Sequence, residues 1–230
     1  MEWYRDSIAC LEVAELLLLD IEEKQREAIR DNNILPFLKV SIKNCLENCR
    51  SPLDYAANFI FDTYCREKCK PEKLKKISHK IQFPIVKDPQ NFNGHIHYYF
   101  EGLKNKKIIQ IFESSQKYNV TWLDDLTKLV NENKHRNLTL QNINNTTRIN
   151  HGSLGGRINF YGTTFSGNTN DLVIDGKMYS GFEMTKAFSN IDATFDRKYM
   201  FADLNKDVLQ TLQTIVIETR KVIDALHDVL

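Results

Sequence analysis

The chain has 230 residues, of which 42% are apolar and 27% are charged, a composition typical of globular proteins. Its formal net charge of +1 excludes a strong overall field that would attract nucleic acid or a membrane surface, so nucleic-acid binding would need a local patch. No apolar run approaches the ~20 residues that cross a bilayer, and the first residues show neither a basic start nor a cleavable apolar segment. We therefore expect a cytoplasmic protein without membrane partners.

The first part of the chain carries helical patterns. Apolar residues recur at helical spacing within residues 4–30, and a second helix is expected from about residue 35 to 48. Ser51-Pro52 predicts the start of a third helix, because serine caps exposed amide groups and proline suits a first turn. The alternative is one long helix that bends at Pro52.

Two cysteine pairs, Cys45/Cys49 and Cys65/Cys69, have a spacing found in stapled helical hairpins and in metal sites. If a hairpin turned at Pro52, Cys49 and Cys65 would lie roughly 24 Å apart, because a helical segment would separate them. That distance excludes a disulfide or a shared metal ion. We interpret these cysteines as buried thiols in a reducing compartment.

Residues 77–104 look irregular, and helices are expected over residues 107–118 and 121–136. His95 and His97 could form a metal-binding pair. No carboxylate or cysteine accompanies them nearby, however, and metal sites need further ligands. The sequence therefore predicts no metal and no other cofactor.

The composition changes after residue 137. The Asn- and Thr-rich segment 142–150 is predicted to be a loop. Asp175-Gly176 is a hairpin turn signal between two of the strand-like runs that follow. These runs span residues 157–164, 171–174, 177–179 and 193–201.

An amphipathic helix is expected over residues 205–230, where it closes the chain. Its buried positions are predicted to be Val208, Leu212, Ile215 and Val222. The fold class is therefore α+β. Residues 1–140 would form a helical bundle, and residues 141–230 a small antiparallel sheet plus a C-terminal helix that packs back on the bundle.

The most informative stretch is the helix expected over residues 121–136, because cations and a histidine gather in its last turn. Histidine exchanges protons readily near neutrality, and His135 lies between Lys134 and Arg136. These three residues are the best candidates in the chain for anion binding or proton transfer. Their position near a helix C-terminus also suits the negative end of the helix dipole, which is a purely structural role.

The same helix carries a polar stripe opposite its apolar positions. Asp124, Lys128, Asn131 and His135 fall together on this side. One interpretation is a solvated face, in which Asp124 and Lys128 form an ordinary ion pair. The other is a face toward a cleft or a second subunit, where Lys128 and Arg136 bind phosphate and His135 exchanges a proton.

Four segments of the chain resemble a group of uncharacterised bacterial proteins. That group repeats a Leu-Asp helix, a Phe-Pro-Ile segment, a Gln-Pro-Tyr segment and an Asn-x-Asp-Lys-His-Arg helix. The resemblance covers roughly residues 50–140, and this chain departs from it at Lys117 and Asn133. The four segments are Ser51-Pro52-Leu53-Asp54-Tyr55, Phe83-Pro84-Ile85, Gln116-Lys117-Tyr118 and Asn131-x-Asn133-Lys134-His135-Arg136.

More distantly, the helical half is similar to HEPN domains, helical bundles that often act as metal-independent ribonucleases in toxin–antitoxin and antiphage systems. Their motif sets four to six residues between an arginine and a histidine, commonly with a polar residue after the arginine. His135 and Asn131 fit the histidine and the polar residue. Arg220 and His227 meet the spacing as a second option, with Lys221 after the arginine. The positions allowed for the first arginine hold Lys128, Leu129 and Val130.

The HEPN resemblance implies cleavage of an RNA backbone by the 2′-hydroxyl. His135 would act as general base or acid, Lys128 or Arg136 would stabilise the developing charge, and Asn131 would orient the phosphate. RNA and either a protein partner or a second copy of the chain would be its partners. The alternative is a non-catalytic interaction, scaffold or sensor subunit of a bacterial complex, which the missing arginine and the near-neutral charge favour.

Overall fold

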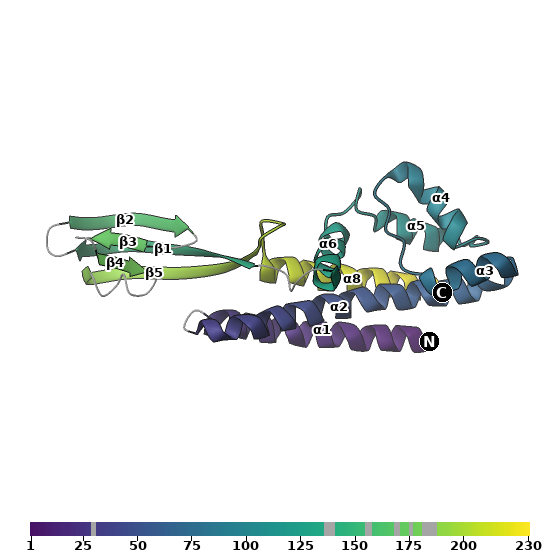
Figure 1. Cartoon of the computed structure of the whole chain (residues 1–230), viewed down its shortest axis with the longest axis horizontal. Helices are drawn as coiled ribbons and strands as arrows, with labels where there is room; N and C mark the ends of the chain where they lie inside the picture. The colour runs from purple at the N-terminus through teal and green to yellow at the C-terminus, as the bar shows by residue number, and fades with distance from the viewer. Residues whose placement is uncertain (29–30, 136–140, 155–157, 168–170, 175–176, 181–187) are drawn as a thin grey trace. The chain divides into compact units, whose positions relative to one another are not determined.

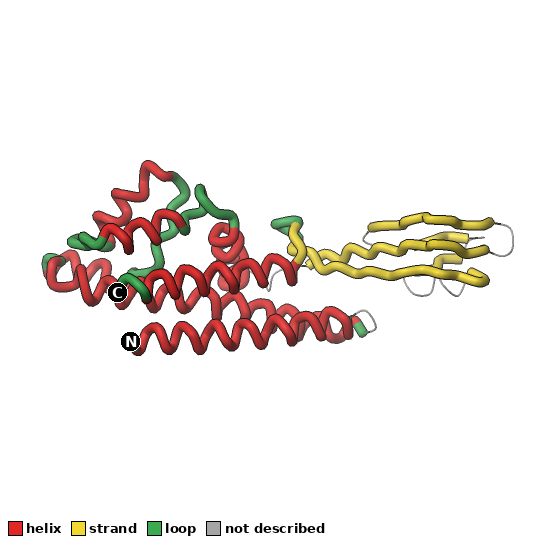
Figure 2. The backbone as a smooth tube through the Cα atoms, turned by 180° about the vertical axis from the view of Figure 1, so that it is seen from behind, coloured by secondary structure: helices red, strands yellow, loops and turns green. Residues whose placement is uncertain are grey.

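The chain forms two compact units in a computed structural model, one helical and one built of strands (Figures 1 and 2). The helical unit comprises residues 1–139 and 209–230, and the sheet unit comprises residues 140–208. This architecture confirms the predicted α+β class, with helices dominant in the N-terminal part. The structure describes residues 1–28, 31–135, 141–154, 158–167, 171–174, 177–180 and 188–230.

Three long helices are the frame of the helical unit: α1 (Glu2–Glu27), α2 (Leu35–Ile60) and α8 (Val208–His227). A 3-10 turn, Asn32–Ile34, precedes α2, and the two first helices lie side by side (Figure 1). The positions predicted to be buried in α8 are all buried, because they form its apolar stripe. Within the described part of the chain, no helix is both long and apolar enough to cross a membrane.

The predicted break at Ser51-Pro52 is wrong, and the alternative of one long helix is correct. α2 continues through Pro52, although proline removes one helical hydrogen bond at a cost of ~3 kcal/mol. The residues around Pro52 explain why the helix survives. Cys49, Leu53 and Ala56 are fully buried, so ending the helix here would expose a continuous apolar face.

Shorter elements follow α2. The segment 77–104 was expected to be irregular, but it contains α4 (Pro89–Tyr99). Asp88-Pro89 signals a turn in the sequence. Here it begins the helix instead, because the Asp88 carboxylate accepts a hydrogen bond from the Gln90 amide and proline occupies the first turn. The other elements are π-helical Phe61–Cys65, 3-10 turns Arg66–Lys68 and Ser78–Lys80, α3 (Pro71–Ile77), α5 (Lys106–Ser114) and α6 (Trp122–His135).

The sheet unit is built around β1 (Gln141–Leu154), which pairs antiparallel with β2 and with β5. The strand order is β2-β1-β5-β6, and β3 and β4 form a separate antiparallel pair. The Asp175-Gly176 turn signal lies outside the described residues. The remaining bounds are β2 (Ile158–Gly167), β3 (Asp171–Ile174), β4 (Lys177–Ser180), β5 (Phe188–Phe201) and β6 (Lys206–Asp207).

The prediction of a loop over residues 142–150 is wrong, because this segment is the centre of the larger sheet. Its many Asn and Thr residues were read as turn formers. Alternate positions nevertheless turn inward: Thr147 and Ile149 are buried, and Ile149 belongs to an apolar cluster with Leu154. Pairing on both sides therefore decides the conformation of β1, against the local preference of its residues.

The burial of α2 leads to a stability prediction. Leu46 is fully buried in α2, whereas Leu16 of α1 is 65% exposed. We expect Leu46→Ala to lower the free energy of unfolding by about 2–5 kcal/mol, because it leaves a cavity. Leu16→Ala should change it by at most about 0.5 kcal/mol. Chemical denaturation of both variants measures the difference, and equal losses would contradict the described packing of α2.

Candidate functional site

One cavity of about 520 Å³ in the helical unit gathers polar and charged side chains from five parts of the chain. This volume is within the range of small-molecule sites. Helix α2, the segment 80–87 that begins at the end of the 3-10 turn Ser78–Lys80, helix α4, the turn after α5 and helix α6 all contribute. The lining residues are Arg50, Asp54, Lys80, Gln82, Phe83, Ile85, Lys87, His95, Tyr99, Lys117, Thr127, Val130 and Asn131.

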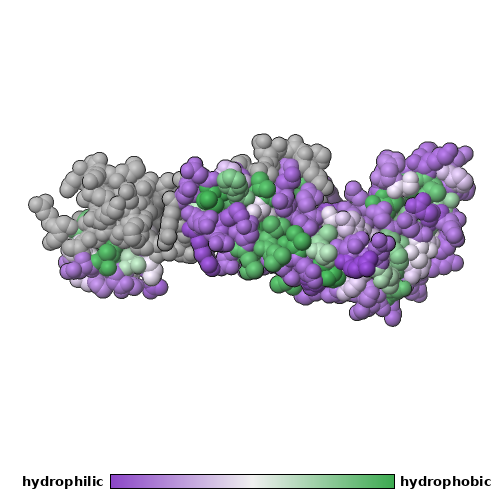
Figure 3. All heavy atoms as spheres, turned by 90° about the horizontal axis from the view of Figure 1, so that it is seen from below, coloured by the Kyte–Doolittle hydropathy of each residue, from purple (hydrophilic) through white to green (hydrophobic). Residues whose placement is uncertain are grey.

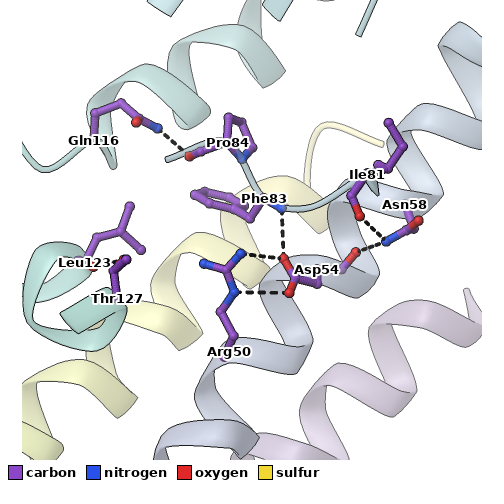
Figure 4. A network of polar contacts seen from close by, with 9 residues as sticks. All are labelled: Arg50, Asp54, Asn58, Ile81, Phe83, Pro84, Gln116, Leu123 and Thr127. Carbon is purple, nitrogen blue, oxygen red and sulfur yellow. Dashed lines mark hydrogen bonds and ion pairs between the residues drawn. The ribbon is translucent and has the colours of Figure 1, made fainter. Parts of the chain in front are cut away.

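The Asp54 carboxylate joins α2 to the segment 80–87 (Figure 4). Its Oδ2 accepts a hydrogen bond from Arg50 Nε at 3.0 Å, and its Oδ1 accepts one from Arg50 Nη2 at 2.9 Å. Oδ1 also accepts a bond from the Phe83 backbone amide at 2.9 Å. Charge-assisted bonds of this bidentate kind are strong and directional. Asp54 therefore sets the position of both Arg50 and Phe83.

The Gln116 amide holds the same segment from the other side. Its side chain is fully buried; Nε2 donates to the Pro84 carbonyl at 2.8 Å and to the Phe112 carbonyl at 2.7 Å. Its Oε1 accepts a bond from the Val86 amide at 2.7 Å. Asn58 adds a bond to the Ile81 carbonyl at 3.2 Å. Together with the bond from the Phe83 amide to Asp54, the segment on this wall of the cavity is thus held at four backbone groups, those of Ile81, Phe83, Pro84 and Val86.

The charged groups around the cavity are mainly positive. Arg50, Lys80, Lys87 and Lys117 face a single lining carboxylate, Asp54. Lys117 donates to Asp124 at 3.0 Å, so its charge is partly balanced. Lys80 and Lys87 are exposed and form no ion pair with any residue that the structure describes. An anion that enters the cavity would therefore meet two uncompensated lysines.

An aromatic wall stands beside these cations. His95 and Tyr99 are one turn apart on α4, and their ring centroids lie 4.7 Å apart at an interplanar angle of 39°. Burial lowers the pKa of His95, because a charged imidazole loses solvation there. The ring is therefore neutral near pH 7, with one nitrogen able to donate a hydrogen bond and the other able to accept one.

Of the polar stripe predicted on α6, some residues line the cavity and others do not. Asn131 lines the cavity. Lys128 does not: its ammonium pairs with Asp124 at 2.7 Å, and its side chain is 60% exposed. Burial alone would raise the pKa of Asp124, but hydrogen bonds from Lys128 and Lys117 outweigh it and hold that pKa below its ordinary value. Thus Lys128 fits the interpretation of a solvated ion pair.

The candidates in the last turn of α6 cannot be placed in this way. The side chains of Lys134 and His135, and the whole of Arg136, lie outside the described residues. Their predicted roles in anion binding and proton transfer stay predictions.

The second Arg–His pair has a structural role. Arg220 donates to Glu15 of α1 with its Nη2 at 2.9 Å. The His227 ring stacks on Tyr4 at a centroid distance of 3.7 Å. Both side chains attach α8 to α1, and neither lines the cavity.

The four segments that carried the bacterial resemblance meet at this cavity. Asp54, Phe83, Lys117 and Asn131 come one from each segment, and all four line it. The sequence alone does not single out four of the lining residues, namely Arg50, Lys80, Lys87 and Tyr99, and it marks His95 only as one of a metal-binding pair. His95 and Tyr99 have helical spacing, but the turn signals around them predict an irregular segment. Nothing in the sequence marks Lys80 and Lys87 as site residues except that they lie on either side of Phe83-Pro84-Ile85.

The Asp54 network predicts a large effect of one substitution. Asp54→Ala removes the carboxylate that pairs with the Arg50 guanidinium, whose side chain is only 11% exposed. It also removes the acceptor of the Phe83 backbone amide. We expect the free energy of unfolding to fall by about 3 kcal/mol. Asp62→Ala is the matched control, because it removes an i,i+4 pair with Arg66 that is about half exposed. It should cost at most about 0.5 kcal/mol. Urea titration of both variants measures this, and a similar loss in each would refute the role of Asp54.

No protein family, curated protein or solved structure matches the chain in comparisons with known proteins. The function must therefore be inferred from the residues of the cavity.

Proposed function

We propose that the helical unit binds RNA, with phosphate groups held in this cavity. The observation that supports the proposal is the convergence of four cations from three segments of the chain: Arg50 from α2, Lys80 and Lys87 from segment 80–87, and Lys117 from the turn after α5. Lysine and arginine bind phosphate oxygens through charge-assisted hydrogen bonds. The overall charge of +1 gives no general attraction for nucleic acid, so affinity would come from this local patch.

Cleavage of the bound RNA is the enzymatic form of this proposal. The 2′-hydroxyl would attack the adjacent phosphorus to form a 2′,3′-cyclic phosphate, one histidine would accept its proton, and the 5′-oxygen would leave as a hydroxyl after taking a proton from that histidinium or from water. His135 is the group that the HEPN resemblance implies. His95 is a second candidate, because it lines the cavity and its lowered pKa leaves it neutral and able to accept a proton.

A non-catalytic role in a complex is the second candidate function. Val13, Leu16 and Leu19 recur at intervals of three along α1 and are 44%, 65% and 65% exposed. The side of the helical unit on which α1 lies also shows apolar surface (Figure 3). Exposed apolar residues gathered in this way favour a protein partner or a second copy of the chain. In this form RNA would bind without being cut.

The cellular setting rests on the resemblance. A phage-defence or toxin–antitoxin system in the bacterial cytoplasm would give such a protein access to RNA. The buried free thiols of Cys45, Cys49, Cys65 and Cys69 suit a reducing compartment.

RNA binding leads to a test on the lysines. We expect Lys87→Ala to weaken binding of a short RNA uniformly across sequences, because it removes a phosphate contact. The slope of log affinity against log salt should fall in magnitude by about 0.7. Lys75→Ala is the control, because Lys75 is exposed on α3 and does not line the cavity. Fluorescence anisotropy at several salt concentrations measures both. No RNA binding by the parent protein, or equal effects of the two variants, would reject the proposal.

RNA cleavage has its own test. The parent protein should cut RNA in the presence of a metal chelator, and His135→Ala should abolish the cutting, because proton transfer contributes about 10²–10⁴-fold to such reactions. His95→Ala tests the second candidate, and His97→Ala is its control, because His97 is exposed and lies outside the cavity lining. Gel analysis of the products measures the rates. RNA bound but left intact by the parent protein would select the non-catalytic form.

A further inference from the structure

We infer that the cavity accepts one unpaired nucleotide of a single RNA strand, with its base against His95 and Tyr99 and its phosphate beside Lys80 and Lys87. This inference rests on the proposed RNA binding and specifies the form of RNA that is bound. The cavity volume of about 520 Å³ suits a ligand of nucleotide size. A double helix offers no unstacked base to such a recess, whereas single strands and loops do.

The aromatic wall is already arranged for stacking. His95 and Tyr99 are half-buried, so packing limits the motion of both rings before a ligand arrives. Beside them, Phe83 is fixed through its backbone bond to Asp54 and through edge-on contact with Phe112, at a centroid distance of 5.2 Å. Every base has an aromatic face, so stacking on such side chains tolerates any sequence.

The cations lie within the same cavity as these rings. Lys80 and Lys87 stand at the two ends of the stretch that Asp54 and Gln116 hold by its backbone. Their stems are therefore anchored on a fixed segment while their ammonium groups remain exposed. A nucleotide is the class of ligand that carries both a flat aromatic group and a phosphate. A polyphosphate chain would satisfy the lysines and leave the rings uncovered.

Polar groups of α6 complete the wall. Asn131 is exposed, lines the cavity and presents amide donors and an acceptor. Thr127 also lines the cavity; it donates its hydroxyl hydrogen to the Leu123 carbonyl at 2.6 Å, which leaves its oxygen able to accept a hydrogen bond (Figure 4). These groups suit the hydrogen-bonding edge of a base.

The first test uses the unaltered protein. A fluorescent single-stranded oligoadenylate is bound and then displaced with adenosine monophosphate or with ribose 5-phosphate, which differ only in the base. If the base stacks in the cavity, the nucleotide should displace the probe at roughly ten-fold lower concentration. Equal displacement by the two compounds would overturn the inference, as would binding of a matched RNA duplex as tightly as the single strand.

The second test separates the base from the phosphate. Tyr99→Leu keeps apolar bulk but removes the ring, and we expect roughly ten-fold weaker binding of the oligoadenylate with unchanged binding of inorganic polyphosphate. Tyr161→Leu is the matched control, because Tyr161 is 74% exposed on β2 and does not line the cavity. It should leave both affinities unchanged. Circular dichroism establishes that each variant is folded.

The outcomes distinguish the two proposals. If the parent protein does not bind oligoadenylate, whether or not it binds polyphosphate, the proposed RNA binding itself fails. If it binds both, and folded Tyr99→Leu binds oligoadenylate as tightly as the parent, only the inference of a stacked nucleotide fails.

Discussion

The contact between the Asp54 carboxylate and its three donor N–H groups is the interaction on which the cavity depends. It lies on a long helix, yet it fixes a backbone amide 29 residues away in sequence. Its partner Arg50 is nearly buried, so the pair replaces the water that both charges would otherwise need. The uncharged Gln116 side chain holds the same stretch through hydrogen bonds to its backbone. Together they convert an extended stretch, Phe83 to Val86, into a rigid wall.

Beside this wall, positively charged side chains gather around the cavity. Four cations around one cavity repel one another, and two carboxylates offset part of that cost: Asp54 at Arg50 and Asp124 at Lys117. Lys80 and Lys87 have no such partner among the described residues and rely on water to screen them. An anion that replaced this water would relieve the repulsion. The arrangement is thus less stable than a neutral cavity would be and better suited to a negatively charged ligand.

The parts of the fold that sequence predicts are those decided within one segment. The stripes of α1 and α8 are examples, because Leu11 and Leu212 follow from helical period alone. β1 and α4 were missed because neighbours decide them: Thr147 is buried by pairing on both sides, and Asp88 acts as a helix cap where it could equally form a turn. Of the residues that line the cavity, the sequence singles out Asn131 for contact with phosphate and His95 only for a metal-binding pair, and it does not single out Arg50. The places of Arg50 and His95 depend on Asp54, Phe83 and Tyr99, which only the folded chain brings together.

The absence of an arginine before His135 looked like an argument against phosphate chemistry at α6. The structure supplies a guanidinium from another helix, because Arg50 of α2 lines the same cavity as Asn131 of α6. Asp54 occupies Arg50 Nε and Nη2, and Nη1 has no hydrogen-bond partner among the described residues. The planar guanidinium therefore keeps donors for a phosphate oxygen while its orientation is already set. Lys117 similarly supplies the charge that was expected of Lys128, since both bind Asp124 and only Lys117 lines the cavity. The proposed phosphate recognition would thus depend on contacts between segments, and a motif confined to one helix would not be required for it.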